Sequence, residues 1–130
     1  MDNKKYILQR SNLFEFINKL SQDYETYIPV KKGEQRFYKK YCGPEDDILI
    51  GEVRAFEPLK AFFSRAREVV AQGFEPDIPQ SNGKPLAIIG VKACDLKGFK
   101  VQDFVFAEQG SEDPFYVKSR EQNLIISTDC

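Results

Sequence analysis

The sequence predicts a single α/β domain over residues 1–130, built on a mixed β-sheet with helices packed against it. Two short apolar runs, Leu86–Val91 and residues 123–128, have the composition of strands that are buried on both faces of a parallel sheet. Helical segments lie between them. A strand–helix–strand unit joins parallel strands of one sheet, almost always with right-handed topology. We therefore expect these two strands to be parallel.

The N-terminal part predicts one helix followed by short strands. Apolar residues recur at positions i, i+3, i+4 and i+7 between about Ser11 and Ser21, as on one face of a helix, and Ser11 or Asn12 can cap its start. Strands are predicted at residues 24–30, 35–41 and 47–53, with turn residues between them. We expect these strands to form an antiparallel or mixed portion of the sheet.

The middle of the chain predicts a second helix and then a loop. The helix begins after Pro58 and ends before Gly73, with one apolar face. Residues 75–85 carry three prolines and a glycine, which is typical of a surface loop. The predicted apolar face of the helix consists of Leu59, Phe62, Phe63, Ala66, Val69 and Val70.

Two helices are predicted between the apolar strands. The first covers residues 96–106, and Asp95 before it is either its N-cap or a functional acid, with the cap favoured. The second begins at Asp113-Pro114, with the aspartate as N-cap and the proline at the first helical position, and runs to about Arg120.

Composition excludes several classes of function. Nineteen basic and twenty acidic side chains leave a net charge of −1, which argues against binding nucleic acid or anionic membranes through bulk charge. No apolar run approaches the ~18 residues of a membrane helix, and residues 1–5 lack the apolar stretch of a secretory signal. These features predict a cytoplasmic protein without a membrane span.

The chain has no histidine and three cysteines. The absence of histidine removes the most common general base and zinc ligand, so a Ser-His-Asp or Cys-His enzyme is excluded within this chain. An odd number of cysteines argues against a closed disulfide framework. Any redox or metal chemistry must therefore use sulfur.

Two of the cysteines follow the predicted buried strands. Cys94 comes just after the first strand, and Cys130 just after the second. Ligands of open α/β sheets bind at the carboxyl ends of the strands, and a helix N-terminus near Cys94 favours a thiolate. The strand order therefore predicts that Cys94 and Cys130 are neighbours at the functional edge. The alternatives are a small buried residue at Cys94 and a chain end without a role at Cys130.

Other candidate residues have structural interpretations. Cys42 has no partner at ligand spacing, and we predict that it is structural or incidental. The Lys31-Lys32 and Lys39-Lys40 pairs are expected on solvated faces. No CxxC pair, GxGxxG loop or GxxxxGK loop occurs.

From Gly90 onward the chain resembles a known family. Its Gly90-Val-Lys-Ala-Cys94-Asp-Leu segment is similar to the Gly-Val-Arg-Pro-Cys-Asp-Leu motif of ferredoxin-type iron–sulfur subunits, which include the anaerobic sulfite reductase A subunit and the sulfhydrogenase beta subunit. Lys92, Ala93 and Ser119 depart from the usual arginine, proline and arginine. The similar segments that follow, in the same order, are Gln102-Asp-Phe-Val-Phe106, Asp113-Pro-Phe-Tyr116, Ser119-Arg-Glu121 and the apolar strand before Cys130.

The resemblance implies the N-terminal module of an electron-transfer subunit that serves a hydrogenase-like or sulfite-reductase-like partner. In that family a downstream half carries further cysteines. With two of these, Cys94 and Cys130 would supply the four thiolates of one 4Fe-4S cluster. We therefore expect a non-catalytic subunit of an oxidoreductase complex that works in anaerobic metabolism, and a chain that is the N-terminal part of a longer protein. Two thiolates are too few for this chain alone to hold a stable cluster.

Two other interpretations stay open. One is an interaction domain that docks partner subunits and whose cysteines are incidental. The other, weaker one is a small-molecule or nucleotide pocket at the strand ends.

Overall fold

The computed structural model describes the chain except at residues 1–5, 45–46, 52–54, 56–57, 64–70, 73–74, 77–82, 109, 111 and 129–130. A four-stranded sheet in the order β2-β1-β5-β6 forms its centre. The strands are β1 (Glu25–Lys32), β2 (Gln35–Lys40), β5 (Leu86–Val91) and β6 (Leu124–Ser127). β1 and β2 are antiparallel, whereas β5 is parallel to both β1 and β6. The predicted mixed α/β fold and its parallel crossover are confirmed.

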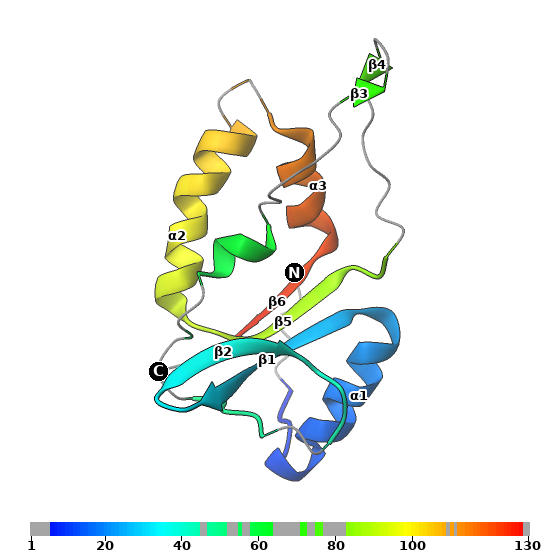
Figure 1. The fold of residues 1–130 in the computed structure, drawn as a ribbon, viewed down its shortest axis with the longest axis vertical. Coiled ribbons are helices and arrows are strands. Elements are labelled where there is room, and N and C mark those ends of the chain that lie inside the picture. The colour runs from blue at the N-terminus through cyan, green and yellow to red at the C-terminus, as the bar shows by residue number, and fades with distance from the viewer. Residues whose placement is uncertain are drawn as a thin grey trace.

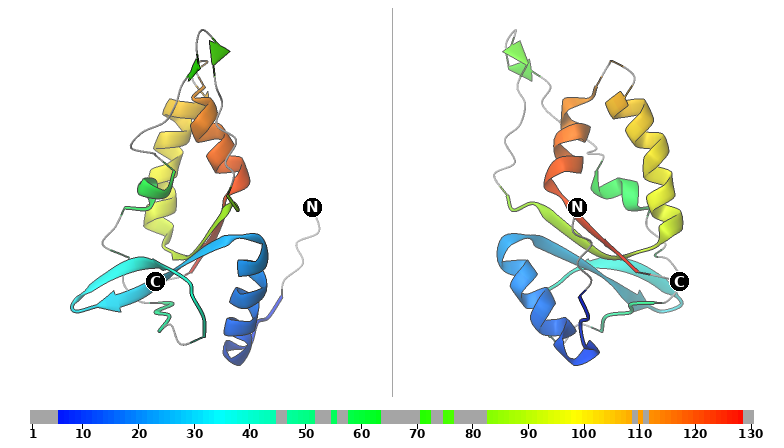
Figure 2. Two further views of the ribbon diagram at one scale, coloured as in Figure 1. Left: turned by 45° about the vertical axis from the view of Figure 1, so that its right-hand side comes forward. Right: turned by 180° about the vertical axis from the view of Figure 1, so that it is seen from behind.

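Helices cover both faces of this sheet (Figures 1 and 2). Helix α1 (Leu13–Asp23), which follows a 3-10 turn at Arg10–Asn12, packs on one face. The other face carries a 3-10 turn at Leu59–Phe62, helix α2 (Ala93–Asp103) with a π-helical turn at Phe104–Glu108, and helix α3 (Pro114–Gln122). The α2, π-helical and α3 segments are the crossover between β5 and β6.

Successive residues of β5 supply the two hydrophobic cores. Ile89 points to the α1 side, where it packs with Ile17 and Ile28. Ile88 points to the opposite side and joins the cluster that contains Phe63, Phe99 and Tyr116. Because β5 contributes to both cores, its side chains are buried from Ala87 to Val91.

An irregularity at Gly90 changes the side of the sheet toward which the last residue of β5 points. The pairing of β5 with β6 shifts register between Ile89 and Val91, and Gly90 has φ +82°. After this shift the side chain of Val91 lies on the α2 side with Ile88. Strict alternation along the strand would have placed it on the α1 side with Ile89. A Cβ atom at Gly90 would lie 2.7 Å from Cγ of Pro29 on β1. The position therefore requires glycine for both its backbone conformation and its close approach to β1.

Three predicted elements differ in the structure. In the strand predicted at 47–53, residues 47–51 form no strand and residues 52–53 lie outside the described part. Ile48 and Ile50 nevertheless pack on the α1 core, and Leu49 N–H donates to the carbonyl of Pro29 at 3.0 Å. The helix predicted after Pro58 begins as a 3-10 turn with Leu59 and Phe63 buried, and residues 64–70 and Gly73 lie outside the described part. The predicted loop begins with strand residues, because β4 (Glu75–Pro76) pairs with β3 (Ala71–Gln72).

The helix boundaries follow the predicted caps only in part. Asp113 caps α3 as predicted, because its carboxylate accepts from the backbone N–H groups of Phe115 and Tyr116, and Pro114 begins the helix. The side chain of Asn12, at the N-cap of α1, makes no capping bond. The prediction that Asp95 caps α2 is wrong. The helix begins at Ala93 with Lys92 at the cap, so Asp95 lies within the first turn, where an acid suits the helix dipole.

Candidate functional site

Cys94 lies at the carboxyl end of β5, in the first turn of α2. Its side chain is exposed, so the alternative of a small buried residue is wrong. The turn is fixed by the carbonyl of Lys92, which accepts from the N–H groups of Asp95 at 3.0 Å and Leu96 at 3.1 Å. The first N–H groups of a helix have no acceptor within it, and this end favours negative charge. The thiol is thus presented to solvent at an anion-favouring helix end.

The ends of β5 and β6 are tied together beside this thiol. Thr128 donates its N–H to the carbonyl of Val91 at 2.9 Å, and Nζ of Lys92 donates to Oγ1 of Thr128 at 3.2 Å. Lys92 is only 2% exposed, so a basic side chain lies buried between the two strand ends. The sequence analysis missed this role of Lys92. Its position directly after an apolar strand is the signal that points to it.

The chain leaving β6 therefore reaches the same sheet edge as Cys94. The described part ends at Thr128, and Cys130 lies outside it. The expected proximity of Cys94 to Cys130 stays a prediction. Among the described residues, no group of three or more cysteine, aspartate or glutamate side chains is arranged to hold a metal ion. The described residues therefore offer one thiolate ligand at this edge and not a complete ligand set.

A pocket of about 240 Å³ opens beside Cys94 between α2 and the turn after Pro58. Cys94 and Asp95 line its rim, and Oε1 of Gln102 is buried without a hydrogen-bond partner in the described structure. The nearby Tyr38 has its pKa raised to about 12, because burial disfavours the phenolate and because Asp95 and Cys94 add negative charge. Tyr38 is therefore a neutral phenol at neutral pH. The remaining lining residues are Pro58, Leu59, Lys60, Gly98 and Phe99.

Cys42 lies at the other end of the sheet. It follows β2, and the backbone N–H of Tyr41 bonds the carbonyl of Thr26, a residue that pairs with Ala87 near the start of β5. Four residue steps of extended strand, about 13 Å, separate that level from the end of β5 at Val91. Cys42 and Cys94 are both exposed, but the strand register places them at opposite edges.

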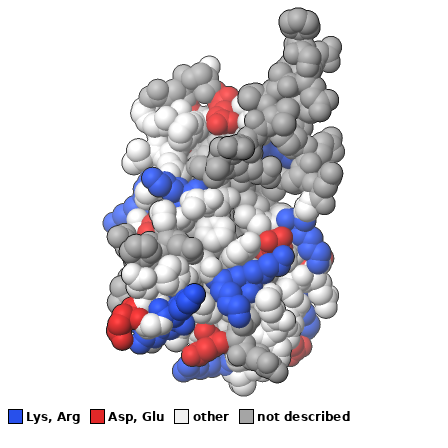
Figure 3. All heavy atoms as spheres, viewed as in Figure 1, with Lys and Arg blue, Asp and Glu red and all other residues white. Residues whose placement is uncertain are grey.

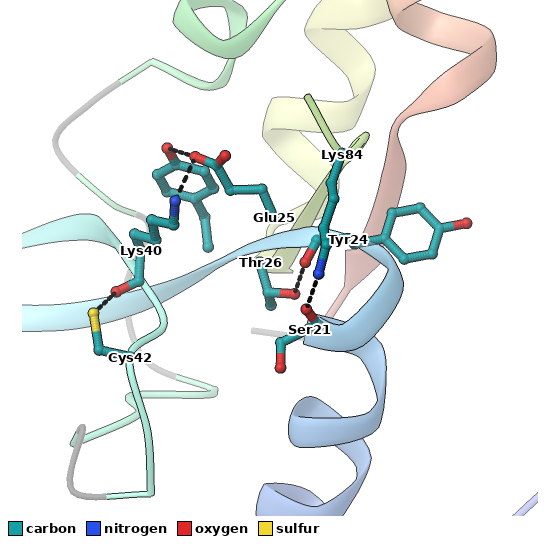
Figure 4. A network of polar contacts seen from close by, with 8 residues as sticks. Ser21, Tyr24, Glu25, Thr26, Lys40, Cys42 and Lys84 are labelled. Carbon is teal, nitrogen blue, oxygen red and sulfur yellow. Dashed lines mark hydrogen bonds and ion pairs between the residues drawn. The ribbon is translucent and has the colours of Figure 1, made fainter. Parts of the chain in front are cut away.

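Local polar contacts surround Cys42 (Figure 4). Its Sγ donates to the carbonyl of Lys40 at 3.5 Å, and Nζ of Lys40 pairs with the Glu25 carboxylate at 3.3 Å. Tyr27 O–H also donates to Glu25, and together with Lys40 it lowers the pKa of that carboxyl below its ordinary value. The contact between Lys40 and Glu25 joins β1 to β2, whereas Cys42 itself makes only a local bond, so its structural or incidental role stays a prediction. The four predicted surface lysines, Lys31, Lys32, Lys39 and Lys40, are exposed.

Comparisons with protein-family models, with curated proteins and with solved structures found no match to this chain. The resemblance from Gly90 onward therefore stays a prediction from its motifs. Within the described residues, no helix combines the length and the apolar character that crossing a membrane requires.

Proposed function

We propose that this chain is the N-terminal module of an iron–sulfur electron-transfer subunit, in which Cys94 and Cys130 are ligands of a 4Fe-4S cluster. The proposal is carried by one observation: Cys94 is exposed at the same sheet edge that the chain reaches as it leaves β6 toward Cys130. The motif resemblance around Cys94 gives that edge its chemical interpretation. We further propose a cytoplasmic location and, as partners, the other subunits of a redox complex.

The residues around Cys94 have the chemistry needed to bind one iron atom of such a cluster. An exposed thiolate can bond iron, and the free N–H groups of a helix start can bond sulfur. Lys92 places a basic side chain between the ends of β5 and β6, two positions before Cys94, where the similar family has arginine. A bound cluster would supply one-electron transfer. The protein would contribute ligand position, hydrogen bonds and local charge, which tune the reduction potential.

Ligand exchange under argon tests the proposal with this chain. The probe is a preformed 4Fe-4S cluster held by four small thiolates. Each cysteine that binds forms one S–Fe bond, one small-thiolate S–Fe bond breaks, and the cysteine proton passes to the leaving thiolate. The iron oxidation states do not change. We expect about two thiols released per cluster in the presence of excess small thiol, and loss of the cluster when that thiol is removed.

Single substitutions assign the ligands. Cys94→Ser and Cys130→Ser should each lower the thiols released from about two to about one, measured together with iron content and visible absorption. Cys42→Ser is the matched control, since it removes an exposed thiol at the opposite sheet edge, and it should behave as the unsubstituted chain. Equal cluster uptake by the Cys94→Ser and unsubstituted chains would contradict the proposal. Failure of the unsubstituted chain to take up any cluster would favour the interaction-domain alternative.

A further inference from the structure

Helix α2 has apolar side chains on two opposite faces. Its inner face packs Leu96 and Phe99 into the core beneath it. On the outer face Val101 is 66% exposed, and Phe104 and Val105 in the adjoining π-helical turn are 52% and 46% exposed. Clustered exposed apolar side chains mark interaction sites more often than isolated ones do. This outer cluster, Val101, Phe104 and Val105, is called the α2 patch below.

The π-helical turn helps to create the α2 patch. Residues Phe104–Glu108 are wound more widely than the α-helix before them, and such turns occur often at functional sites. Phe106, which is itself 41% exposed, contacts the buried Tyr116 with ring centroids 5.3 Å apart, and its carbonyl accepts from the N–H of Asp113 at 2.8 Å. These contacts fix the turn and leave Phe104 and Val105 facing outward.

Charges at the two ends of the α2 patch have opposite signs. Lys97 and Lys100 are exposed on the side toward the start of α2, and Glu108 is exposed one turn beyond Phe104. Within the described structure none of the three has an ion-pair partner. In the view of Figure 3, uncharged atoms cover much of the surface over α2, with basic atoms below them.

This arrangement is complementary to itself when two helices run antiparallel. A two-fold axis passing between positions 102 and 103 would place Val101 opposite Phe104 of a second copy. The same axis would place Lys97 opposite Glu108 of that copy, and each contact would occur twice. Both pairings come from one axis position, so the apolar and the charged contacts require the same register. A partner with a uniformly basic or acidic rim would match only one end of the patch.

From this geometry we propose that the outer face of α2 is a self-association surface, on which two copies of the chain pair as antiparallel helices about a two-fold axis. The inference does not depend on the iron–sulfur role, because it uses neither Cys94 nor Cys130. A single helix pair is smaller than a standard protein interface, so the dimer is weak and depends on concentration.

Sedimentation equilibrium from 10 µM to 1 mM tests the proposal with the full chain. We expect the average mass to rise from 15.0 kDa toward twice that value. Val101→Asp should weaken the dimer at least tenfold, because it places two carboxylates in the apolar centre. Its side chain is mostly exposed in the monomer, so the fold should survive, as circular dichroism can check. A monomer at 1 mM, or an unchanged dimer in Val101→Asp, would overturn the proposal.

Charge reversal tests the register. Lys97→Glu and Glu108→Lys should each weaken self-association several-fold, since each places like charges in both symmetric pairs. Mixing the two variants should restore the dimer, because position 97 of each chain then lies opposite a residue of the other sign at position 108 of its partner. Lys32→Glu, on the β1–β2 hairpin, is the matched control and should have no effect. Weak association that the mixture does not restore would contradict the antiparallel arrangement.

Discussion

The two faces of the sheet are stabilised by different interactions. On the α1 face Ile17, Ile28 and Ile89 are almost completely buried, and the ion pair of α1 between Glu15 and Lys19 lies on its exposed side. On the α2–α3 face aromatic residues dominate, and a half-buried ion pair between Asp103 and Arg120 joins the two helices. The first face therefore depends on aliphatic burial, whereas the second combines aromatic packing with electrostatics.

The Asp103–Arg120 pair is closely integrated into the second face. The Arg120 guanidinium donates to both carboxylate oxygens of Asp103, at 2.9 and 3.1 Å, and Tyr116 O–H donates to the same carboxylate at 2.7 Å. The carbon of the guanidinium lies 4.6 Å from the ring centroid of Phe99. Bidentate pairing and ring stacking are specific to arginine, so lysine at position 120 would not replace it.

The largest effect is expected from truncation on the α1 face. Ile28 is fully buried between helix α1 and the neighbouring strands. Ile28→Ala should lower the free energy of unfolding by about 3–4 kcal/mol, because it loses burial and leaves a cavity. Urea denaturation measures this change. Ile7→Ala, at a 97% exposed position, is the control and should change stability by less than about 0.5 kcal/mol. A similar small effect at Ile28 would show that this core is not well packed.

The next largest loss of stability is expected at Gly90, where the register of β5 shifts against β6. Gly90→Ala should cost about 2–3 kcal/mol, because alanine is strained at φ +82° and its Cβ would meet Pro29. Gly33→Ala is the matched control, since Gly33 has φ +62° with open space around it. The difference between the two variants in urea denaturation isolates the Pro29 contact. Equal losses would mean that Pro29 moves away at no cost.

The sequence predicted those features that local or periodic signals encode. Asp113-Pro114 marks the start of α3 because capping involves neighbouring residues, and the apolar runs of β5 and β6 predicted their parallel pairing. The alternation of Ile48 and Ile50 led to a wrong strand prediction. It indicates that one side of this segment is buried, but the segment does not pair as a strand. Two features depend on contacts distant in sequence: the burial of Lys92 against Thr128, and the close approach of Pro29 to Gly90. One sequence does not reveal such pairings.

The candidate site also combines features that the sequence predicted with features that it did not. The position of Cys94 after β5 followed from the strand pattern, and its exposure agrees with a site at the sheet edge. A pocket at the strand ends was one of the interpretations left open, but its other wall was not predictable, because that wall comes from the turn after Pro58, more than thirty positions earlier in the chain. The α2 patch was also missed. The sequence predicted a helix over residues 96–106 but not which of its faces is covered, and only the packing of α2 shows this.

The stability of the two faces should also depend differently on pH, which is a smaller effect. The hydrogen bonds from Arg120, and also from Tyr116, hold the pKa of Asp103 below its ordinary value of 3.8. The unfolded chain therefore binds this proton more readily, so the stabilisation present above that value is lost as pH falls through the lowered pKa. Asp103→Asn should cost about 1–3 kcal/mol at pH 7 and progressively less as the pH falls below 3.8.

The matched control for Asp103→Asn lies on α1. Glu15→Gln removes the exposed pair with Lys19 and should change the free energy of unfolding by about 0.5 kcal/mol or less at pH 7. Chemical denaturation at a series of pH values compares the two variants. If Asp103→Asn left the pH dependence of the free energy of unfolding unchanged between pH 2 and 5, the Asp103–Arg120 pair would not be the acid-sensitive element of the α2–α3 face.

The smallest effect is a gain in stability at Gly98, on the solvent side of α2. Glycine inside a helix costs about 0.5–1 kcal/mol relative to alanine, and a Cβ at this position meets no atom within 4 Å. Gly98→Ala should therefore raise the free energy of unfolding by about that amount, measured at micromolar concentration where the chain is monomeric. Lys97→Ala, at the neighbouring exposed position, controls for changes in helix propensity and should alter stability far less. A loss of stability in Gly98→Ala would mean that the pocket beside Cys94, which Gly98 lines, has no room for the added methyl group.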